Sequence, residues 1–271
     1  MRVTFWGVRG SFPATGRAFT QYGGDTMCVE VECGETRLVL DAGSGLRGLG
    51  AKLSAGRGPV AANIVLSHLH LDHVMGLTAF APFWRSDARI MLHAAEECLA
   101  DAPGALLSVI RPPLFPADAG TLPAVIGVQE FKLGDAFIPG PGVIVRTVAV
   151  THQGPCAAII VVWRGRKLCY VTDHEHGVAE VDDRLAREIQ GADLLVYDAT
   201  FTDAEMASRR GWGHSSWEEG IRLKRRSGVK LLALAHHDPD RTDPALDELA
   251  EGAARGERNV FFARQGLSLS L

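Results

Sequence analysis

The sequence of 271 residues offers little that points to a membrane, to disulfide bonds or to nucleic acid. Its five cysteines form an odd set without a CxxC pair, which favours reduced thiols and argues against a structural zinc site built on cysteine. The longest fully apolar run, Cys156–Trp163, is far too short to span a bilayer, and "MRVTFWGVRG" has no apolar signal-peptide core. A formal net charge of −4 gives no basic field that would attract nucleic acid. We therefore expect a cytoplasmic protein with no membrane segment.

The chain also has no Ser- or Pro-rich linker, internal repeat or low-complexity tract, so we expect a single domain over residues 1–271. A hydrophobic content of 46% and a charged content of 22% are ordinary for a globular enzyme. Residues 99–123, with "RPPLFPADAG" at their centre, are stiffened by proline. An insertion that covers a pocket and a plain connecting loop both fit this segment.

Short β-rich runs such as "RVTFWGV" and "MCVEVEC" dominate the first third of the chain. Helical patterns then alternate with further apolar runs, and we expect helices at residues 44–54, 178–190, 215–227 and 243–254. Strands first and alternation later predict two β-sheets packed together with helices outside, an α+β architecture.

The segment "VLSHLHLDHVMGL", residues 65–77, places His68, His70, Asp72 and His73 within six positions. In an extended stretch the first three of these side chains point to one side, and His73 then begins a turn. Histidine and aspartate gain nothing from hydrophobic burial, and an aspartate is almost never fully buried unless it is paired. Four donors aimed into one volume therefore indicate a bound cation.

Apolar strands elsewhere in the chain also end in a ligand-type residue. They are "IVLSH" at His68, "VAVTH" at His152, "CYVTD" at Asp173 and "LALAH" at His236. Strands of one sheet that deliver donors at the same edge build a rigid site from remote positions. The alternative is that His152 and His236 are ordinary strand-terminal residues. The motif at 68–73 favours the metal interpretation, because its donors need partners to complete two coordination spheres.

"SHLHLDH" matches the HxHxDH motif of the metallo-β-lactamase superfamily, and the chain resembles that family from "FWGVRGSFP" to "AHHDP". The resemblance implies a four-layer αββα sandwich of two mixed sheets with a two-metal site at one edge. It implies that His68, His70 and His152 bind one divalent ion. Asp72, His73 and His236 would bind the second, and Asp173 would bridge the two. Imidazoles and carboxylates suit Zn²⁺, with Mn²⁺ or iron also compatible.

Asp173 as bridging ligand, "GHSS" at 213–216 and "AHHDP" at 235–239 resemble the phosphodiesterase branch, which holds ribonuclease Z and small cyclic-phosphate phosphodiesterases. The chain lacks the long tRNA-binding arm that ribonuclease Z carries between the positions matching His152 and Asp173. We therefore expect hydrolysis of a small phosphodiester, such as a cyclic phosphodiester, by a hydroxide that two metals activate. Asp72 would also orient this nucleophile. A long nucleic acid is a poor substrate candidate, and relatives of this kind are often homodimers. Alternatives are hydrolysis of a thioester or lactone, and a non-hydrolytic metal-dependent sensor or redox protein.

His214 is our candidate general acid. Ser215 and Glu218 have the spacing of a capping box, which predicts a helix that starts at Ser215, with His214 just outside its N-terminus. The phosphodiesterase branch has a proton-donating histidine in a similar "HS" motif. The alternative is a histidine packed between Trp212 and Trp217.

Two further residues have competing interpretations. Asp41 resembles a family aspartate that orients a ligand histidine, but it also has the position of a cap for a helix from Ser44. Arg9 could contact a phosphate, although a surface salt bridge is the expectation that we favour. We prefer His236 to its neighbour His237 as a ligand, because His236 ends the apolar run. The roles of three histidines that flank proposed ligands stay open: His174, His176 and His237.

Overall fold

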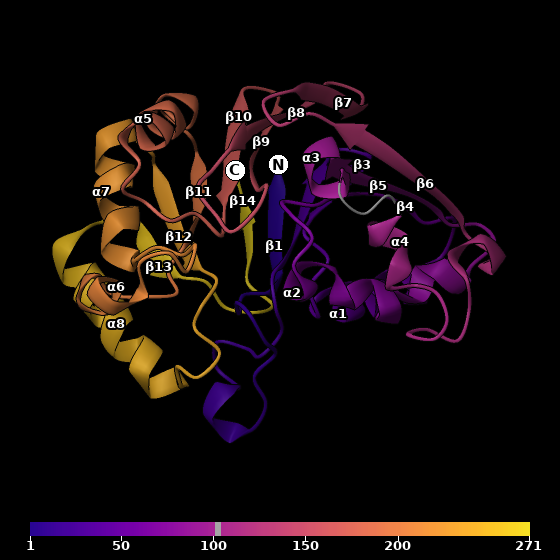
Figure 1. Ribbon diagram of the computed structural model, residues 1–271, viewed down its shortest axis with the longest axis horizontal. Helices are drawn as coiled ribbons and strands as arrows, with labels where there is room; N and C mark the ends of the chain where they lie inside the picture. The colour runs from indigo at the N-terminus through magenta and orange to yellow at the C-terminus, as the bar shows by residue number, and fades with distance from the viewer. Residues whose placement is uncertain (101–103) are drawn as a thin grey trace.

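Two seven-stranded mixed β-sheets lie face to face, and helices cover the outer face of each (Figure 1). This computed structural model describes residues 1–100 and 104–271. Side chains of the facing sheets fill the space between them, and two further apolar clusters lie beneath the helices. The four layers confirm the expected αββα sandwich.

The first sheet contains the strands of the first half of the chain together with the last strand. Its order is β14-β1-β2-β3-β4-β5-β6, antiparallel from β14 to β3 and parallel from β3 to β6. Its strands are β1 (Arg2–Gly7), β2 (Cys28–Cys33), β3 (Thr36–Leu40), β4 (Ala61–Val65), β5 (Arg89–Ala95), β6 (Val125–Phe131) and β14 (Ser268–Ser270).

The second sheet repeats this plan. Its order is β13-β12-β11-β10-β9-β8-β7, antiparallel from β7 to β10 and parallel from β10 to β13. Its strands are β7 (Ala136–Gly140), β8 (Val143–Ala149), β9 (Ala157–Trp163), β10 (Arg166–Val171), β11 (Leu194–Asp198), β12 (Leu231–Ala235) and β13 (Val260–Phe262). Parallel neighbours have their carboxyl ends at the same edge, so each sheet gathers several strand ends in one place.

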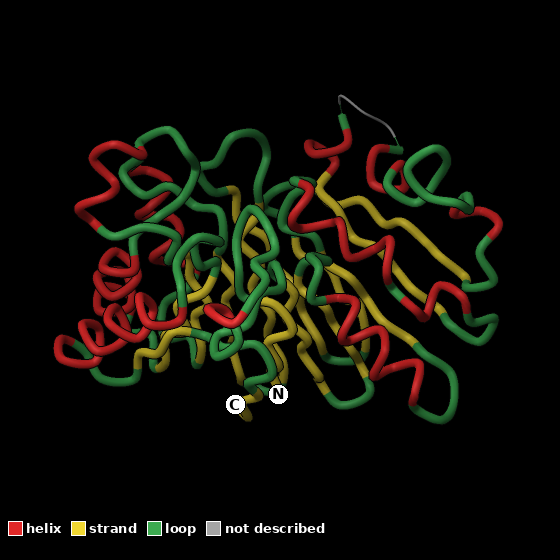
Figure 2. The backbone as a smooth tube through the Cα atoms, turned by 90° about the horizontal axis from the view of Figure 1, so that it is seen from below, coloured by secondary structure: helices red, strands yellow, loops and turns green. Residues whose placement is uncertain are grey.

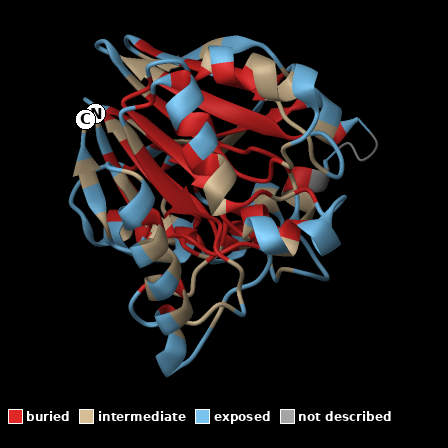
Figure 3. Ribbon diagram, turned by 90° about the vertical axis from the view of Figure 1, so that its left-hand side faces the viewer, coloured by how far each residue is buried: buried red, intermediate tan, exposed pale blue. Residues whose placement is uncertain are grey.

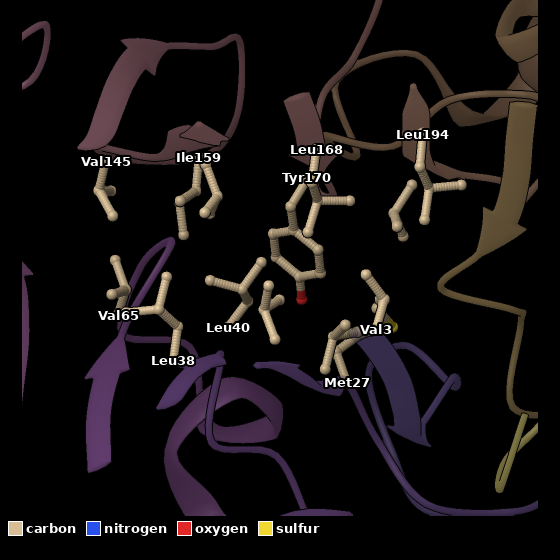
Figure 4. Close-up of a cluster of buried hydrophobic side chains, with 14 of the residues drawn as sticks. Val3, Met27, Leu38, Leu40, Val65, Val145, Ile159, Leu168, Tyr170 and Leu194 are labelled. Carbon is tan, nitrogen blue, oxygen red and sulfur yellow. The ribbon is translucent and has the colours of Figure 1, made fainter. Parts of the chain in front are cut away.

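The central layer is built from one face of each sheet. Leu38 and Leu40 of β3 point into it, as does Tyr170 of β10 from the opposite sheet (Figure 4). Val39, between the two leucines, belongs to the cluster on the outer face. Both faces of these strands are therefore buried, which explains why their sequences are almost continuously apolar.

Helices on the outer faces bury one apolar stripe each and expose the other side to solvent (Figure 3). The helices α1 and α2 lie against the first sheet, and α5, α7 and α8 lie against the second (Figure 1). The α-helices are α1 (Leu46–Ala55), α2 (Leu71–Val74), α3 (Glu96–Leu99), α4 (Ala105–Ser108), α5 (Ala179–Glu188), α6 (Asp203–Arg209), α7 (Trp217–Ser227) and α8 (Asp243–Gly256). The 3₁₀ turns are η1 (Arg17–Phe19), η2 (Met75–Ala79), η3 (Ala81–Trp84) and η4 (Ala119–Thr121).

All four helices expected from the sequence are present, as α1, α5, α7 and α8. The sequence did not reveal β7, β14 or α6. The run "AFIPG" of β7 contains a proline and ends in glycine, and β7 is the edge strand of its sheet, where proline is tolerated. In the segment 99–123 the structure has α4 and η4, whereas residues 101–103 lie outside the described residues. A pocket-covering role for this segment stays a prediction.

The two ends of the chain lie side by side (Figure 2). The amide of Leu271 donates to the carbonyl of Met1 at 2.8 Å, which continues the pairing of β14 with β1. Among the described residues, every helix is too short or too polar to cross a lipid bilayer.

The central layer should dominate the stability of the fold. Replacing Leu40 by alanine leaves a cavity in this layer, and we expect it to lower the free energy of unfolding by about 2–5 kcal/mol. Ile144→Ala removes a side chain that is 42% exposed, and this substitution should change the free energy of unfolding by less than about 0.5 kcal/mol. Urea denaturation of both variants measures the difference, and equal losses would contradict this account of the packing.

Candidate metal centre

Three residues that closely follow apolar strands have a left-handed backbone conformation. They lie at the edge where the carboxyl ends of the parallel strands meet. Asp41 follows β3 with φ 59°, Asp173 follows β10 with φ 54°, and His236 follows β12 with φ 58°. Such conformations cost of order 1–3 kcal/mol outside glycine, less for aspartate, and they cluster at functional sites. The tight turns bring all three side chains to one place between the two sheets.

The histidine-rich segment crosses the same edge directly after β4. His70 is extended (φ −61°, ψ 150°) and precedes the short helix α2, which carries Asp72 and His73. The rings of His68 and His70 are 4.4 Å apart, and each lies 4.8 Å from the ring of His152. The alternation expected from the sequence therefore brings these donors into one cluster.

Asp41 fixes two of the histidines. Its Oδ2 lies 2.7 Å from Nδ1 of His73, and because a carboxylate only accepts, Nδ1 carries the proton. The hydroxyl of Ser67 donates to the same carboxylate at 2.8 Å and so accepts from Nδ1 of His68 at 3.0 Å. Tyr170 donates its phenol to Asp41 at 2.7 Å from the other sheet. The Nε2 atoms of both histidines thus face the cluster, and Asp41 orients the two rings as its resemblance to the family aspartate implied. It does not cap α1.

Two more histidines are held in the same way. Thr200 Oγ1 donates to the carbonyl of His236 at 2.8 Å and therefore accepts from Nδ1 of that ring at 3.0 Å. Nδ1 of His152 lies 3.0 Å from the carbonyl oxygen of Gly213, which can only accept. Nε2 of His236 has no hydrogen-bond partner within the described residues, and Nε2 of His152 lies 3.1 Å from Nδ1 of His70. Hydrogen bonds of this kind are what fix metal-binding histidines in proteins.

Two carboxylates complete the cluster. Asp173 Oδ2 lies 3.2 Å from Nε2 of both His73 and His236. Asp72 Oδ2 lies 3.2 Å from the first of these nitrogens and 3.7 Å from the second. The backbone N–H of Ser11 donates to this same Asp72 oxygen at 2.8 Å, which fixes its position. The carboxylates thus lie between the imidazoles from both sheets.

Buried atoms of the cluster lack the partner that their chemistry requires. Within the described residues, Nε2 of His68, His73 and His236 and Oδ2 of Asp173 have no hydrogen-bond partner. Lone pairs that face one another at 3.2 Å in a buried place repel unless positive charge lies between them. Nitrogen and oxygen donors at this spacing fit divalent metal ions.

The electrostatics of the cluster also require positive charge among the buried donors. Burial lowers the pKa of His73, but the nearby Asp173, Asp41 and Asp72 raise it well above its ordinary value. Burial raises the pKa of Asp173, but His236 and His73 lower it well below its ordinary value. The carboxylate of Asp173 therefore stays ionised and requires cationic charge nearby, from protons or from metal ions.

The predicted ligands fall into overlapping groups with donor atoms within 4.8 Å of one another. One group is His68, His70 and His152, and a second is Asp72, His73 and His236. Asp173 groups with His68 and His73, and a fourth group joins it with Asp198, His214 and His236. The structure thus brings all seven predicted residues together, and their division between two ions stays our prediction.

His214 lies beside this cluster and is paired with Asp198. Its Nδ1 is 3.0 Å from Asp198 Oδ2 and 3.5 Å from Asp173 Oδ1, and its ring stacks on that of His236 with centroids 5.0 Å apart. Burial lowers the pKa of His214, but Asp198 outweighs this and raises the pKa to about 9. The protonated form of the ring is therefore favoured at the edge of the cluster, and its role as general acid stays a prediction.

The predicted start of the helix after His214 was wrong by one residue. Ser216, and not Ser215, caps α7, and its hydroxyl accepts from the amide of Glu219 at 3.1 Å. Ser215 is buried and its hydroxyl contacts Tyr197 and His176 instead. The sequence offers two serines in a row followed by two glutamates, so the capping spacing fits either register.

The neighbouring histidines have other contacts. His237 is fully buried, its Nε2 lies 2.9 Å from the carbonyl of Ala263, and burial lowers its pKa to about 3. His174 pairs with Asp182 at 3.0 Å, and His176 contacts Ser215 at 2.6 Å. The structure therefore places His236, and not His237, at the cluster.

Arg9 is not the surface residue that we favoured. Its side chain is fully buried and donates to the carbonyls of Gly23, Asp238 and Arg241, with Asp243 as its ion-pair partner at 3.8 Å. This arginine ties the loop after β1 to the loop after β12. It thereby holds the segment whose Ser11 amide contacts Asp72.

Asp198 and Glu175 are the important residues that the sequence did not reveal. Asp198 accepts from the amide of Asp173 at 3.0 Å and from His214, so it fixes a predicted ligand and the candidate acid together. It ends the apolar run "LLVYD" and has the same signature as the other strand-end donors. Glu175 accepts backbone amides of the loop before His214, a role that leaves no pattern in the sequence.

The fold and this cluster match known proteins. Residues 36–237 match the family described as "Beta-lactamase superfamily domain". The chain belongs to this superfamily. It has the metallo-β-lactamase fold and is a metal-dependent hydrolase.

Curated and solved relatives cover nearly the whole chain. A ribonuclease Z of Haloarcula marismortui is 24% identical over 98% of this chain and 96% of its own length. A diphosphatase of the PhnP family has a TM-score of 0.73 at 16% identity, covering 100% of this chain and 97% of that one. Zn²⁺-bound PqqB of Methylobacterium extorquens has a TM-score of 0.72 at 18% identity, with both chains fully covered. At these identities the solved structures show the fold alone. The ribonuclease name does not fit our expectation that long nucleic acid is a poor substrate.

Replacing each of the two adjacent histidines separately by alanine tests which of them is the metal ligand. His236→Ala should lower the bound metal per chain strongly, because Nε2 of His236 faces both carboxylates. His237→Ala removes a ring whose Nε2 contacts a backbone carbonyl, so metal content should stay close to that of the wild type. Elemental analysis of purified proteins measures both, and equal or reversed losses would count against the assignment.

Proposed function

We propose that the protein is a phosphodiesterase that hydrolyses small phosphodiesters, cyclic ones included, at a dinuclear metal centre. The observation that carries this proposal is the pairing of two features at one edge. The first is a cluster of donors with unpartnered atoms, and the second is His214, a proton carrier held by Asp198. Metal ions and a proton donor at one place fit attack on phosphorus with protonation of the leaving group.

In this proposal each predicted ligand keeps its role from the sequence. His68, His70 and His152 would hold one ion, Asp72, His73 and His236 would hold the other, and Asp173 would serve both. When bound, the ions supply a Lewis acid that activates water near neutral pH and neutralises the charge of the phosphoryl oxygens. Zn²⁺ is our choice of metal from the donor types, and the Zn²⁺-bound PqqB supports this choice.

The other steps belong to the residues of the chain. The amide of Ser11 fixes one oxygen of Asp72, so that this carboxylate can orient the attacking water. His214 donates its proton to the leaving alkoxide and is recharged through solvent. Asp198 orients the ring and favours its protonated form. Thr200 and Asp41 keep Nε2 of His236 and His73 directed into the cluster.

RNA is the second candidate substrate, because the curated relatives include enzymes named ribonuclease Z. Between His152 and Asp173 this chain has only β9, a tight turn and β10, so no arm is present there to hold a large RNA. We therefore favour the small substrate. A panel of cyclic phosphates, linear dinucleotides, precursor tRNA, a thioester and a lactone separates these reactions. We further propose that the protein is cytoplasmic and that it forms a homodimer. Measurement of its mass in solution tests the homodimer.

Metal content is the first test. The metal-replete protein should contain about two divalent ions per chain and should cleave a generic aryl phosphodiester. Chelation should abolish this activity and lower the melting temperature, because ions that bind only the folded state stabilise it. Elemental analysis and thermal unfolding of both forms measure these effects. A metal-free protein after metal-replete expression would contradict the proposal.

His214→Ala is the second test. A general acid predicts normal metal content and a loss of turnover of roughly 10²–10⁴-fold, larger for a substrate with a poor leaving group. The measurement compares two aryl phosphodiesters whose leaving phenols differ in pKa. Loss of metal would make His214 a ligand, and unchanged turnover on both substrates would leave it a packing role.

A further inference from the structure

The loop between α6 and α7, residues 210–216, is fixed to the metal centre by hydrogen bonds. The carboxylate of Glu175 accepts the amides of Gly211 at 2.9 Å and Gly213 at 2.8 Å. The carbonyls of the same two glycines accept from the side chains of Gln153 and His152. Two loops that follow strands of the second sheet therefore hold this one in place.

The glycine at 213 is required by this arrangement. Its φ is +81°, and a Cβ atom there would lie 2.2 Å from Nδ1 of His152. A residue with a side chain would force the loop away from the centre. The close approach indicates that the position of the loop matters in detail.

The loop presents an aromatic ring and a cation to solvent. Trp212 is 53% exposed, although it is a large apolar side chain on a rigid loop. The guanidinium of Arg209 lies 4.6 Å from the centroid of its ring and 5.9 Å from that of Phe201. Within the described residues Arg209 has no carboxylate partner, so its charge is available to an anion.

This pair lies close to the candidate acid. The buried Phe201 ring contacts both Trp212, at 6.3 Å, and His214, at 5.9 Å between centroids. One aromatic ring thus separates Trp212 from the residue that protonates the leaving group. An exposed aromatic side chain on a loop that is fixed beside a charged centre is typical of a ligand-binding site.

We propose that Trp212 and Arg209 form a subsite that binds a flat aromatic ring on the leaving group of the substrate. The ring stacks on Trp212, and Arg209 attracts the negatively charged phosphodiester. This inference rests on the proposed phosphodiesterase function, because the leaving-group side is defined by His214. An aryl group and a nucleobase share the required chemistry, and the experiment separates them.

The test uses two methyl phosphodiesters with leaving alcohols of similar size, benzyl and cyclohexylmethyl, and a third that releases thymidine from its 5′ oxygen. Trp212→Ala should lower kcat/KM for the benzyl ester about 10- to 100-fold more than for the cyclohexylmethyl ester, mainly through KM. Trp212→Phe should restore most of the difference. A larger loss for thymidine than for benzyl identifies a nucleobase as the natural ring, and the reverse identifies a simple aryl group.

Controls keep the outcomes distinct. Trp84→Ala removes another exposed tryptophan, which is not adjacent in sequence to any cluster residue, and it should not change the preference between the esters. Equal losses on both esters in Trp212→Ala would overturn the subsite. If the wild type cleaves neither these esters nor any other phosphodiester of the panel, the proposed function fails. Calorimetry of benzyl phosphate and cyclohexylmethyl phosphate with the metal-loaded protein then decides the subsite. A preference for the aromatic ligand that Trp212→Ala removes upholds it, and no preference overturns it.

Discussion

The crowding of carboxylates and imidazoles into one buried sheet edge is the constraint on which the rest of this structure depends. Each of these groups would be better solvated in water, and several buried nitrogen and oxygen atoms lack a hydrogen-bond partner. Such an arrangement persists only if the scaffold holds it rigidly and if positive charge enters it. The two packed sheets supply the rigidity, and divalent ions supply the charge with the right preference for nitrogen and oxygen.

The scaffold and the centre are not separate parts of the molecule. Asp41 receives hydrogen bonds from Ser67 and His73 on the first sheet and from Tyr170 on the second. Tyr170 belongs to the central apolar layer (Figure 4), so packing between the sheets sets the position of a carboxylate that orients two histidines. A change in the packing of that layer is therefore transmitted to the donors at its edge.

Much of the fold could be predicted from the sequence, because buried strands and amphipathic helices leave periodic patterns. The layers and the four main helices follow from those patterns. The cluster could be predicted because donors that follow apolar runs meet at one edge when the strands are parallel. Asp198 carries this same signature within "LLVYD" and could have been recognised.

Other features depend on contacts that no local pattern encodes. The burial of Arg9 arises from carbonyls more than 200 positions away along the chain, at Asp238 and Arg241. Glu175 acts on backbone amides, which every sequence offers equally. The capping position at Ser216 was ambiguous because two serines precede two glutamates, and tertiary contacts of Ser215 decide the register. Tertiary contacts therefore settle the details that short motifs leave open.

The pairing of the two chain ends has a consequence for how this enzyme can be handled. Met1 and Leu271 are joined by backbone hydrogen bonds at the start of β1, whereas Gly7 at the other end of that strand leads to the loop of Arg9 and Ser11. The two residues thus lie at the opposite side of the sheet from the cluster of metal-ligand candidates. A short peptide could close the chain into a ring, and new ends opened in a surface turn would give a circular permutant. The same geometry allows the protein to be tethered through both ends to one support with its reactive edge facing away.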